Sequence, residues 1–204
     1  MQAQGATTSG VYTVTINGKE VDVLCEMEGG SMWTVIQQRE SGAVSFYRKW
    51  ETYQKGFGEL NGNFWLGLDN IYNIVGTGTQ YRVKFHITDS QQGAKTATYE
   101  SFSIADNSDE YRLAISGYSG DAGEAMFARH DGQQFTTIDN DNDNYGQNCA
   151  VRFKGAWWHK SCHFANLNGE YGNDANGEGL NWFPLTTHDR SATYTRIQVQ
   201  PVAP

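Results

Sequence analysis

Proline, cysteine and long apolar runs are all scarce in this sequence. The 204 residues include 3 prolines and 3 cysteines. No run of about 18 apolar residues predicts a membrane span, and residues 1–4 do not resemble a signal peptide, so we expect no membrane insertion. An odd number of cysteines in a secreted protein leaves one thiol without a partner in the chain. No Asn-x-Ser/Thr motif is present, so N-glycosylation gives no guide to the compartment.

Positive charge is also scarce. The chain has 15 Lys and Arg against 23 Asp and Glu, which gives a formal net charge of -8. An acidic surface repels phosphate backbones, so we expect no nucleic-acid partner. Glycine is abundant, with 23 residues, and aromatic side chains make up 13% of the chain. This composition indicates turns between aromatic-rich strands, and the length suits one domain.

Alternation of apolar and polar residues predicts several strands. The Asn-Gly pair at 17–18 favours a tight turn, so the first two strands should form a hairpin. The expected strands cover residues 11–16, 21–25, 33–36, 81–88, 111–115 and 194–199.

One helix is expected from a spacing of aromatic residues. Phe46, Trp50, Tyr53 and Phe57 recur at helical intervals, which would place them on one face. Gly56 then supplies a stop.

After residue 117 the regular pattern fades into a long region rich in glycine, asparagine and aspartate. Such a region has little repetitive hydrogen bonding, so bound ions, disulfides and buried aromatic side chains usually stabilise it. Residues 138–163 offer all three kinds of group. The order of elements therefore predicts a sheet, then a loop-built lobe, then a closing strand.

The carboxylates of Asp139, Asp141 and Asp143 alternate along this region. They suit Ca²⁺ better than Mg²⁺, and a solvated cluster of Asx turns fits them equally well. An EF-hand does not fit, because a loop that starts at Asp139 lacks glycine at its sixth position. A loop that starts at Asp141 has Arg152 at its twelfth.

Cys149 and Cys162 leave two alternatives open. They could form a disulfide worth roughly 2–4 kcal/mol, or bind a metal together with His159 and His163. A zinc protease needs a His-Glu-x-x-His helix, but Lys, Ser and Cys separate these two histidines. The simpler interpretation of His159 is a hydrogen-bonded structural residue.

Catalytic signatures are not found. Residues 117–121 approach a nucleophile elbow, but Asp121 stands where that motif requires glycine. Residues 76–78 lack the third glycine of a dinucleotide loop. We therefore expect a binding module and not an enzyme.

Short runs from one end of the chain to the other match one family in order. They are Thr8-Ser9-Gly10-Val11-Tyr12, Trp33-Thr34-Val35-Ile36-Gln37, Phe46-Tyr47-Arg48-Lys49-Trp50, Gly56-Phe57-Gly58, Phe64-Trp65-Leu66-Gly67-Leu68, Tyr118-Ser119-Gly120-Asp121-Ala122-Gly123, Asn148-Cys149-Ala150, Gly155-Ala156-Trp157-Trp158, Cys162-His163 and Asn166-Leu167-Asn168-Gly169. On these runs the chain resembles the fibrinogen C-terminal (fibrinogen-like) domain of ficolins, tachylectins, tenascins and invertebrate fibrinogen-related proteins.

The resemblance implies an α+β fold. It would have a twisted, mainly antiparallel central sheet, few short helices and a loop-rich C-terminal lobe for calcium and ligand. The implied divisions of the single domain 1–204 are an N-terminal sub-lobe (1–34), a central sheet (35–123), a loop-rich lobe (124–192) and a closing strand (193–200).

The resemblance also implies a calcium loop, which aligns by counting back from Cys149. Asp141 and Asp143 would give side-chain oxygens, and Tyr145 and Gln147 backbone carbonyls, to Ca²⁺. Asp139 is then a neighbour and not a ligand.

The family's C-terminal disulfide would join Cys149 and Cys162. Cys25 matches the second cysteine of the family's N-terminal pair, and no cysteine precedes it here. We therefore expect Cys25 to be free or mispaired, in a domain taken from a larger secreted protein.

In members that are lectins, a pocket for an N-acetyl group lies beside a cis Cys-His peptide, which corresponds here to Cys162–His163. Phe153 would supply an apolar wall. Acetyl-binding members carry a Tyr-Ala pair where this chain has Asn176 and Gly177, so the expected ligand contacts lose a wall and a hydroxyl. This region resembles the tenascin branch more than the ficolin branch.

The resemblance implies an extracellular, secreted, calcium-binding recognition module. The expected function is lectin-like, with glycans or acetylated groups bound in innate-immune pattern recognition. The alternative is a matrix or signalling domain that binds an extracellular protein through the C-terminal loop lobe, as in tenascins. Because weak sites gain strength by multivalency, we expect an oligomer in the full-length parent protein.

Overall fold

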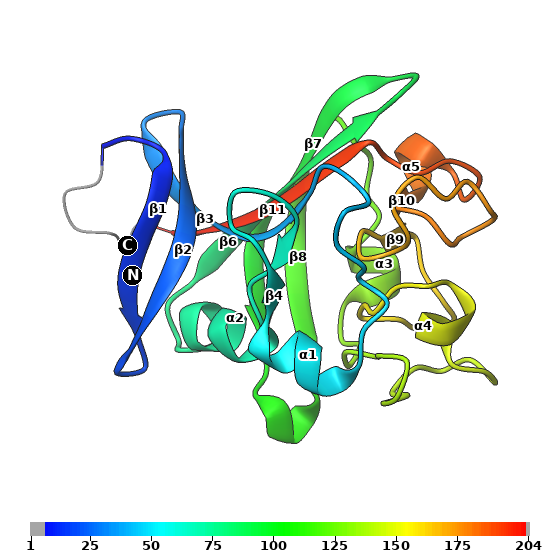
Figure 1. The fold of residues 1–204 in the computed structure, drawn as a ribbon, viewed down its shortest axis with the longest axis horizontal. Helices are drawn as coiled ribbons and strands as arrows, with labels where there is room; N and C mark the ends of the chain where they lie inside the picture. The colour runs from blue at the N-terminus through cyan, green and yellow to red at the C-terminus, as the bar shows by residue number, and fades with distance from the viewer. Residues whose placement is uncertain (1–6, 203–204) are drawn as a thin grey trace.

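A twisted antiparallel sheet forms the centre of the structure, a computed structural model that describes residues 7–202 (Figure 1). Its strands lie in the order β1-β2-β3-β11-β6-β7-β8, and the short strands β4 and β5 extend it beside β3. The strands are β1 (Gly10–Ile16), β2 (Lys19–Glu28), β3 (Ser31–Arg39), β4 (Phe57–Gly58), β5 (Phe64–Trp65), β6 (Tyr81–Asp89), β7 (Gly93–Ile104), β8 (Leu113–Gly120), β9 (Ala165–Asn166), β10 (Asn181–Trp182) and β11 (Tyr194–Pro201). The helices are α1 (Trp50–Lys55), α2 (Leu68–Val75), α3 (Phe127–His130), α4 (Cys149–Arg152) and α5 (Phe183–Thr186), with a 3₁₀ turn η1 (Asn107–Asp109). The predicted α+β architecture is confirmed.

The hairpin predicted at the Asn-Gly pair is also confirmed. β1 and β2 pair antiparallel, with Ile16 opposite Lys19. The φ angles are 48° at Asn17 and 76° at Gly18. A two-residue turn with positive φ at both positions matches the twist of the flanking strands, so the local sequence determines this register.

The closing strand lies in the middle of the sheet and not at its edge. β11 pairs with β3 on one side and with β6 on the other, so Ile197 lies opposite both Gln37 and Phe85. Along β6 every second residue is buried, as the alternating sequence predicts. A segment from the end of the chain therefore joins the N-terminal strands to the rest of the sheet.

The helix expected over residues 46–57 is shorter than predicted. It is α1, which begins after extended backbone at Lys49 and ends before Gly56, whose φ is 90°. Phe46 precedes it, and Phe57 belongs to β4. The ring centroids of these two phenylalanines are nevertheless 4.7 Å apart, so the aromatic spacing reflects one shared core and not one helix.

Two of the longer elements, α2 and β7, were not predicted. The buried residues of α2 are Leu68, Ile71, Ile74 and Val75, which lie on one face of the helix. β7 has exposed residues at its start, which weakens its alternation. The strand expected to include Tyr111 begins two residues later, because Tyr111 lies in a turn with φ of 50°.

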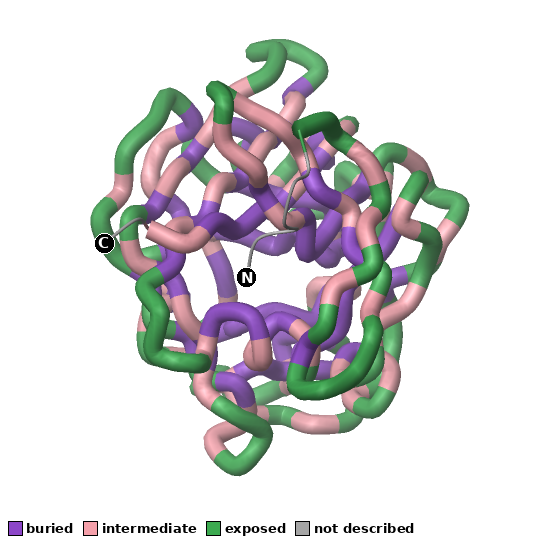
Figure 2. Tube along the Cα trace, turned by 90° about the vertical axis from the view of Figure 1, so that its left-hand side faces the viewer, coloured by how far each residue is buried: buried purple, intermediate pink, exposed green. Residues whose placement is uncertain are grey.

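Residues 124–192 contain only short helices and the two-stranded β9–β10 sheet. Figure 1 shows most of this lobe on the side of the sheet opposite the β1–β2 hairpin. Two buried tryptophans anchor it, since Trp158 Nε1 donates to Tyr111 O at 2.8 Å and Trp182 Nε1 donates to Gly123 O at 2.9 Å. Buried segments lie in the interior and exposed loops around them (Figure 2).

The predicted sub-lobe boundaries stay predictions, and residues 1–6 and 203–204 of the predicted domain lie outside the described residues. Within residues 7–202, every helix is too short or too polar to cross a membrane.

Candidate functional site

Asp139 connects the acidic loop, the segment with Asp139, Asp141 and Asp143, to the start of α1. Its Oδ1 accepts hydrogen bonds from the backbone N–H of Trp50 at 2.8 Å and from Thr137 Oγ1 at 2.9 Å. The first of these bonds joins the loop to the start of α1. Asp139 is therefore engaged in holding the loop in place.

Asp141 and Asp143 lie side by side in this loop. Asp143 accepts from the N–H groups of Tyr145 and Cys149, each at 2.8 Å, and Asp141 Oδ1 lies 3.4 Å from Asp143 N. Burial and the like charge of Asp141 raise the pKa of Asp143 to about 6. Neither carboxylate forms an ion pair with any side chain of residues 7–202.

The donor set of this loop fits a hard cation. The backbone carbonyls of Tyr145 and Gln147 accept no backbone hydrogen bond from the described part of the chain. Two carboxylates and two free carbonyls are oxygen ligands of the kind that Ca²⁺ prefers. Residues 7–202 contain no group of three or more His, Cys, Asp or Glu side chains suited to a metal, so carbonyls or water would have to complete the shell.

Cys149 and Cys162 form a disulfide, with an S–S distance of 2.04 Å. This bond removes both thiolates from the alternative metal site with His159 and His163. Cys149 begins α4, whose N-terminus is capped by Asn148. The disulfide therefore connects α4 to the segment just before His163.

Cys25 is a free, buried cysteine, as expected. It lies in β2, and its side chain belongs to the hydrophobic core. Burial raises the pKa of its thiol, which lowers the fraction of reactive thiolate.

The position of the cis peptide was predicted one residue too late. The cis bond joins Ser161 and Cys162, and not Cys162 and His163. The chain reverses here, with Lys160 N donating to Cys162 O at 2.8 Å. No proline marks the bond, so its position is decided by the surrounding structure and not by local sequence.

Three of the five predicted ligand residues come together tightly. The rings of Phe153 and His163 meet edge to face, with centroids 4.8 Å apart. Gly177 packs against both: a Cβ placed on it would lie 2.6 Å from Phe153 Cδ1 and 3.5 Å from His163 Cε1. Its backbone N–H is bonded to His188 O at 2.7 Å. The glycine backbone thus lies directly against the two rings that the resemblance places at the acetyl pocket.

The other two predicted ligand residues point elsewhere. The side chain of Asn176 donates to Asp189 Oδ1 at 2.8 Å, on the neighbouring loop. Cys162 is half-buried and its sulfur is held in the disulfide.

His163 is a neutral, buried residue with other histidines around it. Burial, followed by the neighbouring His159 and His188, lowers its pKa well below the usual value. The ring centroids of His159 and His188 lie 5.5 and 5.2 Å from that of His163. At neutral pH the imidazole offers no positive charge to a ligand.

A partly exposed cluster beside this site was not predicted from the sequence. Phe164 and Phe183 stack with ring centroids 5.2 Å apart, and His188 lies 4.8 Å from Phe183. Arg129 covers the Phe164 ring at 4.7 Å. Phe183 is 41% exposed. We call these four residues the aromatic patch; their irregular spacing along the chain gives no periodic signal.

Residues 1–202 match the family model described as the C-terminal globular domain of fibrinogen beta and gamma chains. The chain belongs to this family. The fibrinogen-like domain is 42% identical over 201 residues to Tenascin-R of Gallus gallus, and 40% identical over 201 residues to Tenascin of the same species. Each match covers 97% of the domain, but only 15% and 11% of those much longer proteins.

Solved structures agree with this assignment. The fibrinogen-like globe domain of human ANGPTL2 is 35% identical to the domain, with a TM-score of 0.92 over 97% of this chain and 94% of that one. The lamprey fibrin D-dimer complexed with the peptide Gly-His-Arg-Pro-amide is 34% identical. Its TM-score is 0.89 over 97% of this chain and 70% of that one. The family resemblance and the fold are confirmed, and none of these names denotes an enzyme.

The packing at Gly177 gives a stability prediction. We expect Gly177→Ala to destabilise the domain by about 1–3 kcal/mol more than Gly172→Ala, because both glycines have positive φ but only the first meets a ring. The control, Gly172→Ala, measures the backbone strain alone, since nothing lies within 4 Å of its added Cβ. Urea denaturation of both variants provides the measurement. Equal losses would contradict the close packing of Gly177 on Phe153.

Proposed function

We propose that this fibrinogen-like domain is a secreted, extracellular recognition module without catalytic activity. It binds a protein partner through its C-terminal loop lobe, residues 124–192. Its relatives support this proposal: tenascins are matrix proteins, and the related lamprey fibrin structure contains a bound peptide. Because the domain spans a small part of the tenascins, it would act within a larger and oligomeric parent.

The observation that carries the proposal is the aromatic patch, which lies beside the contact of Gly177 with Phe153 and His163. Aromatic and arginine side chains contribute much of the binding energy at protein interfaces. Here Phe183 is exposed, and Arg129 lies over Phe164. Gly177 meanwhile fills the space against Phe153 and His163. At this position the lobe therefore offers an aromatic surface to a partner.

A bound Ca²⁺ would support this lobe. We propose that Asp141 and Asp143 hold it through side-chain oxygens and that Tyr145 and Gln147 hold it through backbone carbonyls. The ion would supply positive charge where two adjacent carboxylates have none. The residues from Asp141 to Cys149 lie beside the disulfide, so the ion would order the segment that leads into α4.

Lectin-like binding of glycans or acetylated groups in innate immunity is the second candidate. The edge-to-face pair of Phe153 and His163 favours it, because that pair keeps the apolar wall expected for an acetyl group. Retention of the tetramerised domain on N-acetylglucosamine resin with calcium, and release by free sugar, would support this candidate over the first.

Binding to decellularised matrix tests the protein-partner proposal. We expect the biotinylated domain, tetramerised on streptavidin, to bind matrix treated with glycosidases but not matrix treated with trypsin. Phe183→Ala should weaken binding by roughly tenfold or more, since it removes an exposed aromatic anchor. Val11→Ala is the matched control, because Val11 is 51% exposed but lies in β1, far from the lobe (Figure 1). Loss of binding after glycosidase treatment, or equal effects of the two variants, would contradict the proposal.

A further inference from the structure

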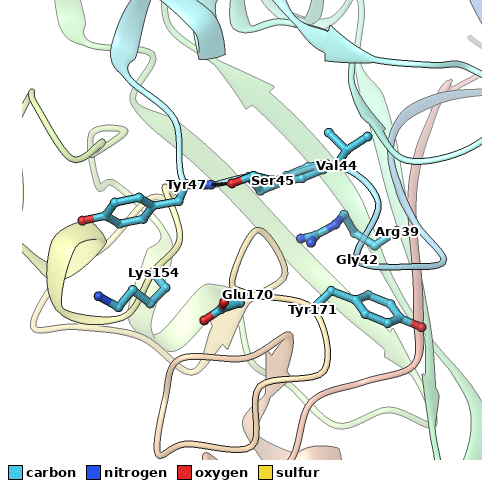
Figure 3. Close-up of a pocket in the computed structure, with 9 residues that line it drawn as sticks. Arg39, Gly42, Val44, Ser45, Tyr47, Lys154, Glu170 and Tyr171 are labelled. Atoms are coloured by element: carbon cyan, nitrogen blue, oxygen red, sulfur yellow. Dashed lines mark hydrogen bonds between the residues drawn. The ribbon is translucent and has the colours of Figure 1, made fainter.

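A cavity lined by neither the proposed calcium ligands nor the residues of the aromatic patch lies between two parts of the chain. Its volume is about 460 Å³, within the range of small-ligand sites. Its walls come from the segment between β3 and α1 and from the loop lobe, with Arg39, Ser45, Tyr47, Lys154, Glu170 and Tyr171 among the lining residues. Figure 3 shows the Arg39 guanidinium directed into the space between these two parts of the chain.

Arg39 is a buried cation without a carboxylate partner. It is 1% exposed, and no ion pair joins it to any carboxylate of residues 7–202. Its Nη1 donates to the carbonyls of Leu167 and Gly169, and its Nε has no hydrogen-bond partner. The guanidinium carbon lies 3.7 Å from the centroid of the Phe46 ring.

This arrangement leaves the buried positive charge of Arg39 only partly compensated. Burial lowers the pKa of Arg39 to about 10, so the side chain is still charged at neutral pH. A buried charge is costly unless an opposite charge or a full set of hydrogen bonds compensates it. Carbonyls and one aromatic ring compensate Arg39 only in part. An anionic group bound in the cavity beside the guanidinium would complete its environment.

The other walls favour a ring that carries hydroxyl groups. Tyr171 donates its hydroxyl to Thr193 O at 2.7 Å, which leaves the ring to line the cavity. Tyr47 is 41% exposed, and Lys154 Nζ lies 5.4 Å from the centroid of its ring. Glu170 forms no ion pair with any described side chain, and its carboxylate can accept hydrogen bonds from sugar hydroxyls.

We propose that this cavity binds a uronic acid, a sugar ring that bears a carboxylate. The planar guanidinium of Arg39 matches a carboxylate in geometry, and Lys154 adds a second positive charge to the cavity lining. Tyr47 and Tyr171 provide faces for the ring, and Glu170 accepts from its hydroxyls. This site is separate from the aromatic patch, so it goes beyond the proposed protein-binding function.

Titration with sodium glucuronate, followed by ligand-observed NMR, tests the site. We expect saturable binding of glucuronate and roughly tenfold weaker binding of glucose, which lacks the carboxylate. Benzoate should bind more weakly than glucuronate, because it has no hydroxyl groups for Glu170. Equal binding of glucose would overturn the carboxylate assignment, and tighter binding of benzoate would overturn the sugar assignment.

Variants locate the binding. Lys154→Gln should weaken glucuronate binding roughly two- to fivefold, while the exposed Lys19→Gln beside the β1–β2 turn should leave it unchanged. Arg39→Met should abolish it. If Arg39→Met does not fold, Tyr47→Ala takes its place, since Tyr47 is exposed and should weaken binding severalfold without unfolding the domain. The same affinity in Lys154→Gln and Tyr47→Ala as in the wild type would overturn the proposal.

Discussion

Calcium should raise the Tm of the wild-type domain by roughly 5–11 °C when its concentration is about 100 times the Kd. A ligand that binds only the folded state stabilises it by about 2.7 kcal/mol at that ratio, and each kcal/mol shifts the Tm of a domain of this size by about 2–4 °C. The double variant Asp141→Asn and Asp143→Asn should lose this shift, because it removes both carboxylates of the proposed site. Differential scanning calorimetry with calcium and then with a chelator measures it.

Asp139→Asn is the matched control for this experiment. It removes one negative charge from the same loop, but its amide oxygen can still accept from Trp50 N–H. We expect this variant to keep the full calcium shift. If Asp139→Asn loses the shift as completely as the double variant, calcium responds to the total charge of the loop and the assigned ligands are wrong.

Reduction of the Cys149–Cys162 bond should destabilise the domain by about 3 kcal/mol, or roughly 6–12 °C in Tm. The disulfide closes a loop with a sequence separation of 13, and opening such a loop returns entropy to the unfolded chain. The calcium shift should weaken as well, because Cys149 N–H is bonded to Asp143 Oδ2 at 2.8 Å. Thermal unfolding with and without a reductant provides the measurement.

A Cys25→Ala background makes this measurement specific, since only the disulfide then responds to the reductant. Peptide mapping of the wild-type protein should link Cys149 to Cys162 and show Cys25 alkylated only after unfolding, because its side chain is 2% exposed. A link between Cys25 and either of the other cysteines, or a Tm unchanged by reductant, would refute the assigned pairing.

Local sequence was sufficient to predict secondary structure wherever a short segment favours one conformation by itself. The Asn17-Gly18 turn and the alternation along β6 were both predicted correctly. The helix at residues 46–57 was predicted too long, because aromatic spacing records which residues share a core and not which element holds them. The cis bond at Ser161–Cys162 was placed one residue late for a related reason: no residue type marks it.

Some residues of the candidate sites were also predicted from the sequence, and others were found only in the structure. Spacing pointed to Asp139, Asp141 and Asp143 together, and the family resemblance selected Asp141 and Asp143, which are neighbours both in the chain and in space. The tight contact of Gly177 with Phe153 could not be predicted, because it depends on how two loops pack. The aromatic patch likewise gathers residues from three separate segments.

The sequence by itself determined the family, because short runs along the whole chain match it in order. It also determined the hairpin and the alternating strands, because turn chemistry and periodicity act between near neighbours. Only the tertiary structure decided that β11 enters the middle of the sheet and that Arg39 is buried without a carboxylate. Both depend on contacts between distant parts of the chain, such as the bond from Arg39 to Gly169 across 130 positions. Such contacts depend on packing, so no local sequence pattern predicts them.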